Sequence, residues 1–250
     1  MKKLFSKLLI TSLVIFTSCA DEQLRFENET FQQKSKLPCE ETCTNISIDV
    51  DVANGNFVAD SINTAVFESV KRIVYFGEIP LDASEYSDLT NSFIKAYDDF
   101  KTEFPDDFMM PWEANVQSKL QYQSAQVIQI RIDHDTFTGG AHGMFASTVL
   151  SFDASTGNQL KTDDFFKDID RLKKMAAEKF KTKFKIANDQ SLQDAGYFFQ
   201  NEDFVLPENV FFSKEGITFH YNVYEIASYA QGAIMLDFTD DEIKPFLKIH

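Results

Sequence analysis

Strict alternation of apolar and polar residues marks the centre of the chain, over residues 127–153. Ile128, Ile130 and Ile132 alternate with polar neighbours, and a second apolar run follows. This period of two is typical of β-strands, because successive side chains point to opposite faces of a sheet. Three glycines lie within five positions around His142, which indicates backbone with positive φ or close chain approach. The pattern predicts a hairpin of half-buried strands whose isoleucines face the core.

The segment before this hairpin combines one strand, two helices and another strand. Alternation predicts the first strand over residues 46–52, and helical spacing of apolar residues predicts a helix over residues 58–76. A capping-box pattern at residues 82–85 opens a second helix. Its aromatic stripe, which extends to Phe100 and Phe104, is expected in the core. Loose alternation over residues 112–123 then predicts the next strand.

The segment after the hairpin repeats this mixture of helix and sheet. Helical spacing over residues 172–184 is followed by a polar loop, a predicted hairpin over residues 209–221 and a last strand over residues 233–238. Thr239 and Glu242 form a capping box that opens a short terminal helix. The whole pattern predicts an α+β fold. It comprises two small α+β domains, residues 45–158 and 159–250, with antiparallel sheets and helices packed on one face.

The first 44 residues lack this periodicity. Three lysines precede a short apolar run that is too short to be a membrane span, and small residues then precede Cys19. This resembles a bacterial lipoprotein signal, in which the cysteine after the cleavage point receives a lipid. An ordinary secretory signal with an incidental cysteine is the alternative. The sequence thus predicts a signal peptide over residues 1–18, lipidation of Cys19 and a polar tether over residues 19–44.

The residues that follow Cys19 bear on where the protein is exported. Ala20, Asp21 and Glu22 resemble the surface-export signal of Bacteroidota lipoproteins, and a solvated tether is the alternative. We therefore expect a lipid-anchored protein of the cell envelope, in the outer membrane of a Gram-negative bacterium. It is surface-exposed if the acidic signal operates. The lipid anchor is its only expected membrane contact.

The net charge limits the classes of possible partner, and the two remaining cysteines indicate a disulfide. The chain has 24 Lys and Arg against 39 Asp and Glu, a formal net charge of −15 at pH 7. This excludes nucleic acid as a partner, since phosphate neutralisation needs a basic surface, and favours a cationic partner or solubility alone. Cys39 and Cys43 form a close pair, which in an exported chain predicts a small disulfide loop, with free thiols as the alternative.

Few residue patterns indicate reaction chemistry. Asp133, His134, Asp135 and His142 are metal-ligand types, but consecutive strand residues alternate between faces and cannot all converge. The chain has no Gly-x-Ser-x-Gly nucleophile elbow and no Walker-type phosphate loop. We therefore expect no catalytic residue, no metal and no cofactor.

Three segments, taken in order, resemble one family: the glycine turn of residues 138–143, the D-x-x-T-G-x-x-L linker that begins at Asp153, and the tyrosine-rich residues 221–232. The family is the extracytoplasmic region shared by the anti-sigma-V factor of Gram-positive bacteria and the amino-terminal part of a peptidoglycan deacetylase. The resemblance covers residues 45–250, with Ser228 where the family usually has proline. It implies a deacetylase-like first domain and an anti-sigma-V-like second domain, the latter similar to a subdomain of heat-shock ATPases. It also implies an envelope role, and the anti-sigma member binds lysozyme.

The third segment holds the most site-like residues. They are Tyr221, Tyr224, Glu225, Tyr229 and Gln231, to which the glycine turn adds His142. Tyrosines beside a carboxylate and an amide suit a glycan or protein surface, while core and loop roles are the alternative. We expect a non-enzymatic binding module for a lysozyme-like protein or for peptidoglycan fragments. The alternatives are an envelope glycan hydrolase or deacetylase, and a structural assembly factor without a small ligand.

Overall fold

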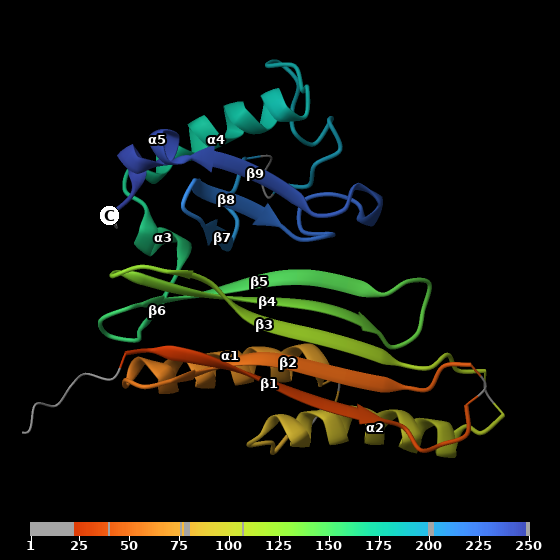
Figure 1. Cartoon of the computed structure of the whole chain (residues 1–250). Helices are drawn as coiled ribbons and strands as arrows, with labels where there is room; N and C mark the ends of the chain where they lie inside the picture. The colour runs from red at the N-terminus through yellow and green to blue at the C-terminus, as the bar shows by residue number, and fades with distance from the viewer. Residues whose placement is uncertain are drawn as a thin grey trace, which may run out of the picture.

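The computed structural model describes residues 23–39, 41–75, 77, 81–106, 108–199 and 203–248. Over these residues two β-sheets are stacked, and helices cover the outer side of each (Figure 1). The predicted α+β class is confirmed. The signal peptide and Cys19 lie outside the described residues. Within the described part, no helix is both long and apolar enough to cross a membrane.

The larger sheet has six strands in sequence order, and its pairs are antiparallel except for one. Its strands are β1 (Arg25–Lys34), β2 (Asn45–Asn54), β3 (Glu113–Gln123), β4 (Val127–Phe137), β5 (Met144–Asp153) and β6 (Gln159–Leu160). The exception is β2 with β3, which run parallel, so the prediction of purely antiparallel sheets is wrong at this pair. Parallel neighbours need a long crossover connection, and the two helices between β2 and β3 supply it.

Strand β1 corrects the prediction that residues 19–44 are a tether. It pairs with β2 along its whole length, from Arg25 opposite Asn54 to Lys34 opposite Asn45. Most of its side chains are exposed, and only Phe26 and Phe31 are large apolar residues. Glutamates and other polar residues thus occupy an edge strand, where they protect the free edge, and this polarity hides the strand in the sequence.

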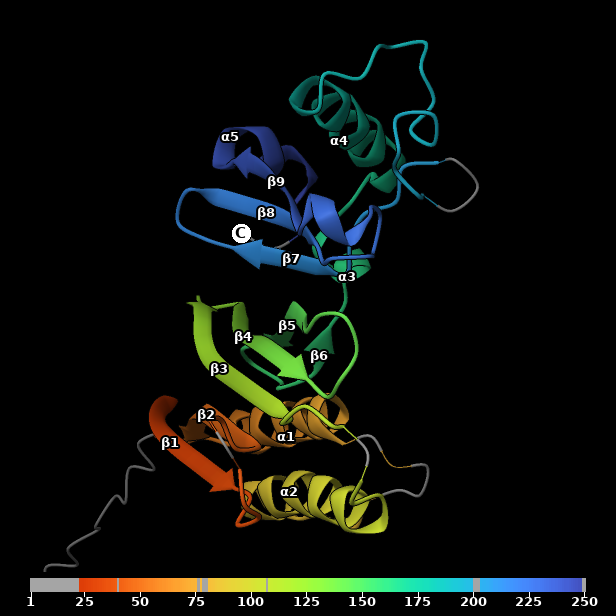
Figure 2. The ribbon, with the colours of Figure 1, turned by 90° about the vertical axis from the view of Figure 1, so that its right-hand side faces the viewer.

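Helices α1 (Val58–Val74) and α2 (Tyr86–Glu103) lie side by side against one face of this sheet (Figure 2). The buried stripe of α1 packs on Ile130 and Ile132, the face predicted for the core. Helix α2 begins three residues later than predicted, because the carboxylate of Asp88 accepts from the backbone N–H of Glu85. Phe100 and Phe104 are exposed at its end, not in the core.

The smaller sheet contains β7 (Asn209–Phe212), β8 (Gly216–Tyr221) and β9 (Ile234–Thr239) in that order, all antiparallel. Helix α4 (Ile169–Lys183) packs on it through fully buried Phe180, which contacts Tyr197 and Phe204. The remaining short elements are α3 (Thr162–Phe165), η2 (Tyr229–Gln231), α5 (Asp240–Ile243) and η3 (Lys244–Phe246). The predicted capping box of Thr239 and Glu242 is confirmed at α5.

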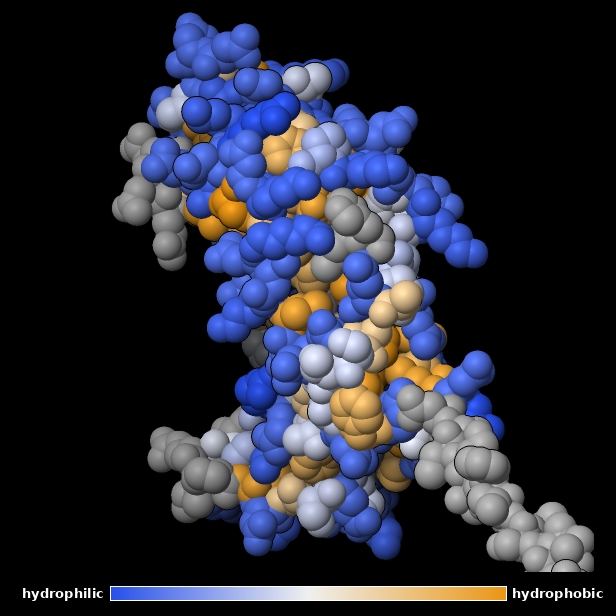
Figure 3. Space-filling model, turned by 90° about the vertical axis from the view of Figure 1, so that its left-hand side faces the viewer, coloured by the Kyte–Doolittle hydropathy of each residue, from blue (hydrophilic) through white to orange (hydrophobic). Residues whose placement is uncertain are grey.

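Each sheet has its own hydrophobic core, which fits a division of the chain into two parts. The two parts are in direct contact. Strand β6, placed in the second part by the sequence, pairs with β5 of the first, and Tyr122 of β3 packs its ring 5.7 Å from that of Phe212 in β7. The face in Figure 3 is mostly hydrophilic, with hydrophobic residues in separate patches.

Candidate binding surface where the two sheets meet

The polar face of β4 faces the smaller sheet, and Gln129 on it is fully buried. Gln129 is 0% exposed, and its amide Nε2 donates to Ser151 Oγ (2.9 Å) and to the carbonyl of Val210 in β7 (2.8 Å). Its Oε1 accepts from the N–H of Phe212 (2.8 Å). The side chain thus bonds β7 as a neighbouring backbone would. These bonds satisfy a buried amide, which would otherwise destabilise the fold.

Two asparagines, Asn209 of β7 and Asn222 in the loop after β8, cover the free edge of β5. Asn222 Oδ1 accepts from the N–H of Ser147 (2.8 Å), and its Nδ2 donates to the carbonyl of the same residue (2.9 Å). Asn209 Oδ1 accepts from the N–H of Val149 (3.0 Å). An uncovered edge presents unpaired backbone groups, so the asparagines both protect β5 and fix the position of the second sheet.

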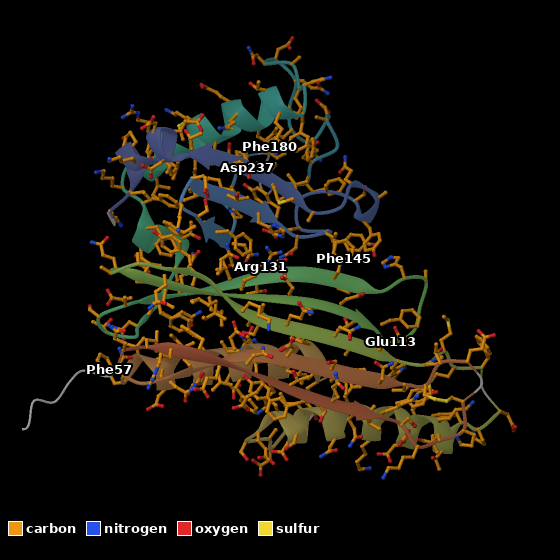
Figure 4. The ribbon with its side chains drawn as sticks, viewed as in Figure 1. Phe57, Glu113, Arg131, Phe145, Phe180 and Asp237 are labelled. Atoms are coloured by element: carbon orange, nitrogen blue, oxygen red, sulfur yellow. A yellow bond between two sulfur atoms is a disulfide. The ribbon has the colours of Figure 1, made fainter. Side chains whose placement is uncertain are left out.

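A charged cluster lies between the sheets, beside these amides. Arg131 Nε donates to Asp133 Oδ1 (2.8 Å), and its guanidinium stacks over the ring of Phe211, 5.1 Å from the centroid. Figure 4 shows Arg131 on the side of the larger sheet that faces the smaller one. His220, 6% exposed, meets Phe211 edge to face. Burial lowers the pKa of His220, and the Arg131 charge lowers it further, against the opposing influence of Asn222 and Asp133.

Serine, histidine and aspartate therefore gather here, but not as a catalytic triad. The hydroxyl of Ser147 donates to Asp133 Oδ1 (2.5 Å), while His220 Nε2 lies 3.2 Å from Asn222 Oδ1. In the described part of the chain no bond joins Ser147 to His220. A nucleophile needs a base within reach of its proton, so this arrangement supports cohesion of the two sheets and not acyl transfer.

An aromatic cluster forms at the end of the β4–β5 hairpin, where it meets the loop after β8. The ring of His142 stacks on that of Tyr229 at a centroid distance of 4.0 Å, and Phe145 meets Tyr229 edge to face at 5.8 Å. Tyr224 lies 5.4 Å from Tyr229. We call His142, Phe145, Tyr224 and Tyr229 the aromatic cluster. Phe145 and Tyr224 are 42% and 52% exposed, so the cluster presents ring faces to solvent.

Hydrogen bonds hold the hairpin and the loop together within the cluster. His142 Nδ1 lies 2.9 Å from the carbonyl of Gly143, so this nitrogen carries the proton in the neutral ring and leaves Nε2 as an acceptor. The hydroxyl of Tyr224 lies 3.2 Å from that Nε2, and the hydroxyl of Tyr229 donates to the carbonyl of Gly143 (3.2 Å). The exposed rings are therefore positioned before any ligand arrives.

Tyr224 has an unusual backbone for a bulky residue, with φ at 65°. The left-handed region costs non-glycine residues roughly 1 kcal/mol or more. Here it directs a half-exposed ring toward His142. Strain of this kind clusters at functional sites, which singles out Tyr224 among the cluster residues, while Tyr229 is the ring that contacts the other three.

The structure brings together only some of the residues that the sequence proposed. His142, Tyr224 and Tyr229 meet in the aromatic cluster. Tyr221 does not, because it is 1% exposed and its hydroxyl donates to the carbonyl of Val205 (2.7 Å). It is a core residue of β8, so its prediction as a ligand-binding residue is corrected.

Glu225 and Gln231 lie beside the cluster without joining it. Partial burial raises the pKa of the Glu225 carboxyl, a hydrogen bond from the N–H of Asn222 (2.8 Å) opposes the shift, and the charge of Glu208 raises the pKa further. Gln231 is exposed at the end of η2. Sequence reasoning missed Phe145, whose only signal was a large apolar side chain directly after the glycine turn.

The other predicted positions lie away from this surface. Asp133 and His134 point to opposite faces of β4, as their adjacency predicted. Among the described residues, no group of three or more His, Cys, Asp or Glu could hold a metal ion. Cys39 and Cys43 are joined as a disulfide, with their Cα atoms 5.4 Å apart.

Comparisons with known proteins follow the same two-part division. Residues 37–145 match the family model described as "Deacetylase PdaC", and residues 162–240 match "Protein of unknown function (DUF3298)". The first part of the chain is thus similar to the PdaC family and the second part to the DUF3298 family, which confirms the family resemblance read from the sequence. We call residues 37–145 the PdaC region and residues 162–240 the DUF3298 region.

Individual relatives agree with this assignment. The peptidoglycan-N-acetylmuramic acid deacetylase PdaC of Bacillus subtilis is 27% identical over 140 residues, which span 54% of this chain but only 29% of that enzyme. A crystal structure of a DUF3298 family member from Bacteroides fragilis covers 92% of this chain and 95% of its own, with a TM-score of 0.68 and 22% identity. The structure of a DUF3298 family protein from Pseudomonas aeruginosa aligns over 91% of this chain and 96% of its own. Its TM-score is 0.64 and its sequence identity is 19%. These two structures share the fold.

Proposed function

We propose that this protein is a lipid-anchored binding module of the cell envelope that recognises the glycan of peptidoglycan and carries out no reaction on it. The observation that carries the proposal is Tyr224, a strained and half-exposed aromatic residue that completes a preformed cluster between the PdaC and DUF3298 regions. Flat apolar ring faces with a hydroxyl at the edge suit sugar rings, whose C–H groups pack on aromatic faces while their hydroxyls find polar partners.

Similarity supports the choice of glycan. The curated relative from Bacillus subtilis is named for peptidoglycan as its substrate, although the match covers less than a third of that enzyme. The signal pattern and Cys19 would place the module in the envelope, where peptidoglycan lies. The Ser147 and His220 arrangement described above favours binding over hydrolysis.

Retention on insoluble peptidoglycan tests the proposal. The wild-type protein should sediment with purified sacculi, and Tyr224→Asn should reduce the retained fraction about tenfold or more, because it removes the half-exposed ring of the cluster. Asparagine tolerates the left-handed backbone, so the fold should be as stable as the wild type within about 0.5 kcal/mol. Phe108→Asn, a change at an exposed aromatic residue on another part of the surface, is the control. Equal retention of the wild type and Tyr224→Asn would contradict the proposal.

The anchor is tested separately. Growth with a clickable fatty-acid analogue should label the wild-type protein, and Cys19→Ala should abolish the label. Label retained in Cys19→Ala would refute lipidation at this cysteine. The readout is independent of ligand binding, so either half of the proposal can fail alone.

The acidic charge supports a second candidate, a cationic lysozyme-like protein as the partner. Opposite charge would mainly accelerate association and make it sensitive to salt. Binding to lysozyme that persists at about 0.5 M salt and depends on Tyr224 would favour this candidate over glycan. Binding that disappears with salt and ignores Tyr224 reports net charge alone.

A further inference from the structure

Two adjacent pockets of about 530 and 490 Å³ lie along the outer edge of β5. We call them together the groove. Both are lined by Thr148 of β5 and by residues of the loop that leads into β7, namely Val205, Leu206, Glu208 and Asn209. The shared lining makes the two pockets immediate neighbours, built from both parts of the chain.

One end of this groove concentrates positive charge. Arg72 near the end of α1, Lys161 of the linker and Lys173 of α4 line the first pocket, with Asp163 and Glu208 as its acidic residues. Three cations against two carboxylates reverses the balance of the whole chain, where acids exceed bases by 15. Within the described part of the chain, none of the three cations forms an ion pair.

The other end approaches the aromatic cluster. Glu225 and Asn222 line the second pocket together with Phe198, and Tyr224 lies between Asn222 and Glu225 in sequence. The charged residues of the second pocket are Glu208 and Glu225, and no Lys or Arg lines it. The three cations therefore all belong to the first pocket.

Strand β5 sets the distance between the two ends. Phe145 marks the aromatic end, and Leu150 lines the cationic pocket. Five residues of extended strand span about 17 Å. A disaccharide stacked on the aromatic cluster would thus have room to extend a short peptide along β5 to the cations.

We propose that Arg72, Lys161 and Lys173 form a subsite for the carboxylates of a peptide attached to the glycan, as in the stem peptide of peptidoglycan. This inference rests on the proposed function and adds the class of ligand that distinguishes stem-bearing glycan from plain N-acetylglucosamine chains. Guanidinium and ammonium groups are the natural partners of carboxylates, and Thr148 and Asn209 add neutral hydrogen-bonding groups to the same walls.

Calorimetry with three defined ligands separates the two subsites. The ligands are the neutral sugar chitotriose, a disaccharide tripeptide from peptidoglycan, and the free tripeptide. The variant Lys161→Gln/Lys173→Gln removes two cations of the groove. Its control, Lys174→Gln/Lys214→Gln, removes two exposed lysines that line neither pocket, so both double variants have the same net charge.

The expected result is selective. Lys161→Gln/Lys173→Gln should lower the affinity for the disaccharide tripeptide about ten- to a hundredfold. Hydrogen bonds between charged groups are stronger than those between neutral groups. The same variant should change chitotriose affinity less than twofold, and the control should match the wild type for every ligand. Raising the salt concentration from about 50 to about 500 mM should lower the affinity for the disaccharide tripeptide and leave the affinity for chitotriose unchanged.

Each contrary outcome is decisive. Wild-type protein that binds chitotriose and the disaccharide tripeptide equally, with no loss in Lys161→Gln/Lys173→Gln, overturns the peptide subsite and leaves glycan recognition intact. Binding of the free tripeptide alone, lost in that variant, supports the subsite and overturns glycan recognition by the aromatic cluster. Binding of none of the three ligands overturns both proposals.

Discussion

The side chain of Asn222 pairs with the backbone of Ser147 in both directions, as a strand residue would. Its Oδ1 accepts from the N–H at 2.8 Å, and its Nδ2 donates to the carbonyl at 2.9 Å. A loop of the DUF3298 region thereby completes the edge of β5, a strand of the larger sheet. The aromatic cluster lies beside this pair, so the pair also sets where its two halves meet.

Replacing Asn222 by alanine should therefore destabilise the protein. Both Ser147 groups would lose their partners in a partly buried place, which we expect to reduce the free energy of unfolding by about 2 kcal/mol. Urea denaturation measures the change. Asn188→Ala is the matched control, because Asn188 is exposed and its side chain has no hydrogen bond within the described structure. Equal stability of the two variants would mean that water replaces the asparagine without loss.

Gln129 gives a second prediction, at the centre of the interface between the sheets. Gln129→Leu keeps the size of the side chain but leaves Val210 O, Phe212 N and Ser151 Oγ without their partner. We expect a loss of about 3 kcal/mol, together with faster hydrogen exchange of the Phe212 amide. Gln117→Leu, an exposed position on β3, should change stability by less than about 0.5 kcal/mol. Unchanged exchange at Phe212 would show that β7 is held by other contacts.

The contrast between the two faces of β4 explains what the sequence could predict. The burial of Ile130 and Ile132 was predicted correctly, because the burial of apolar side chains follows from residue type and period alone. Gln129 and Arg131 have the same pattern as a solvated face. The full burial of Gln129 and the partial burial of Arg131 follow from the way β7 docks. A pairing so distant in sequence leaves no local periodicity.

The candidate surface shows the same limit. Tyr224, Tyr229 and His142 could be proposed because tyrosines and glycines stand out in two segments. Their contact across 82 residues between His142 and Tyr224 could not be read from spacing. Strand β1 was missed for another reason, since a polar edge strand has almost the composition of a tether.

We expect the protein to lose stability in mild acid because of His220. Burial lowers its pKa in the folded protein, so between its folded pKa and the unfolded value near 6.5 the unfolded chain binds more protons. The stabilisation is complete above about pH 6.5 and declines as the pH falls below it. The loss grows as the pH falls from this value toward the lowered pKa of the folded protein. Arg131 and Asp133, which face the ring, act in opposite directions.

Urea denaturation at pH 7.0 and 5.5 tests this with His220→Gln. Glutamine can still donate to Asn222 but does not titrate, so the variant should lose less stability than the wild type over this range. The pKa of His134 is also lowered by burial, and the raised pKa of Glu225 favours the folded state as the pH falls through it. Both groups are present in both proteins and cancel in the difference. Identical pH dependence would show that His220 protonates without strain in the folded protein.

Gly216 is the first residue of β8. Its backbone conformation and the space around its Cα both require glycine. Its φ is 142°, and an added Cβ would lie 2.0 Å from the carbonyl oxygen of Phe238 in β9. Gly196 also has positive φ, at 90°, but an added Cβ there meets nothing within 4 Å. The two glycines therefore separate backbone strain from steric clash.

Gly196→Ala should reduce the free energy of unfolding by about 1 kcal/mol, the cost of placing alanine in the left-handed region. Gly216→Ala should cost about 3 kcal/mol or more, since the backbone of β9 must also move. Thermal denaturation ranks the two, and hydrogen exchange should show faster opening along the β8–β9 pair only in Gly216→Ala. If both variants lose the same stability, the approach of Phe238 to Gly216 is relieved at no cost and the tight entry into β8 is not a constraint on the fold.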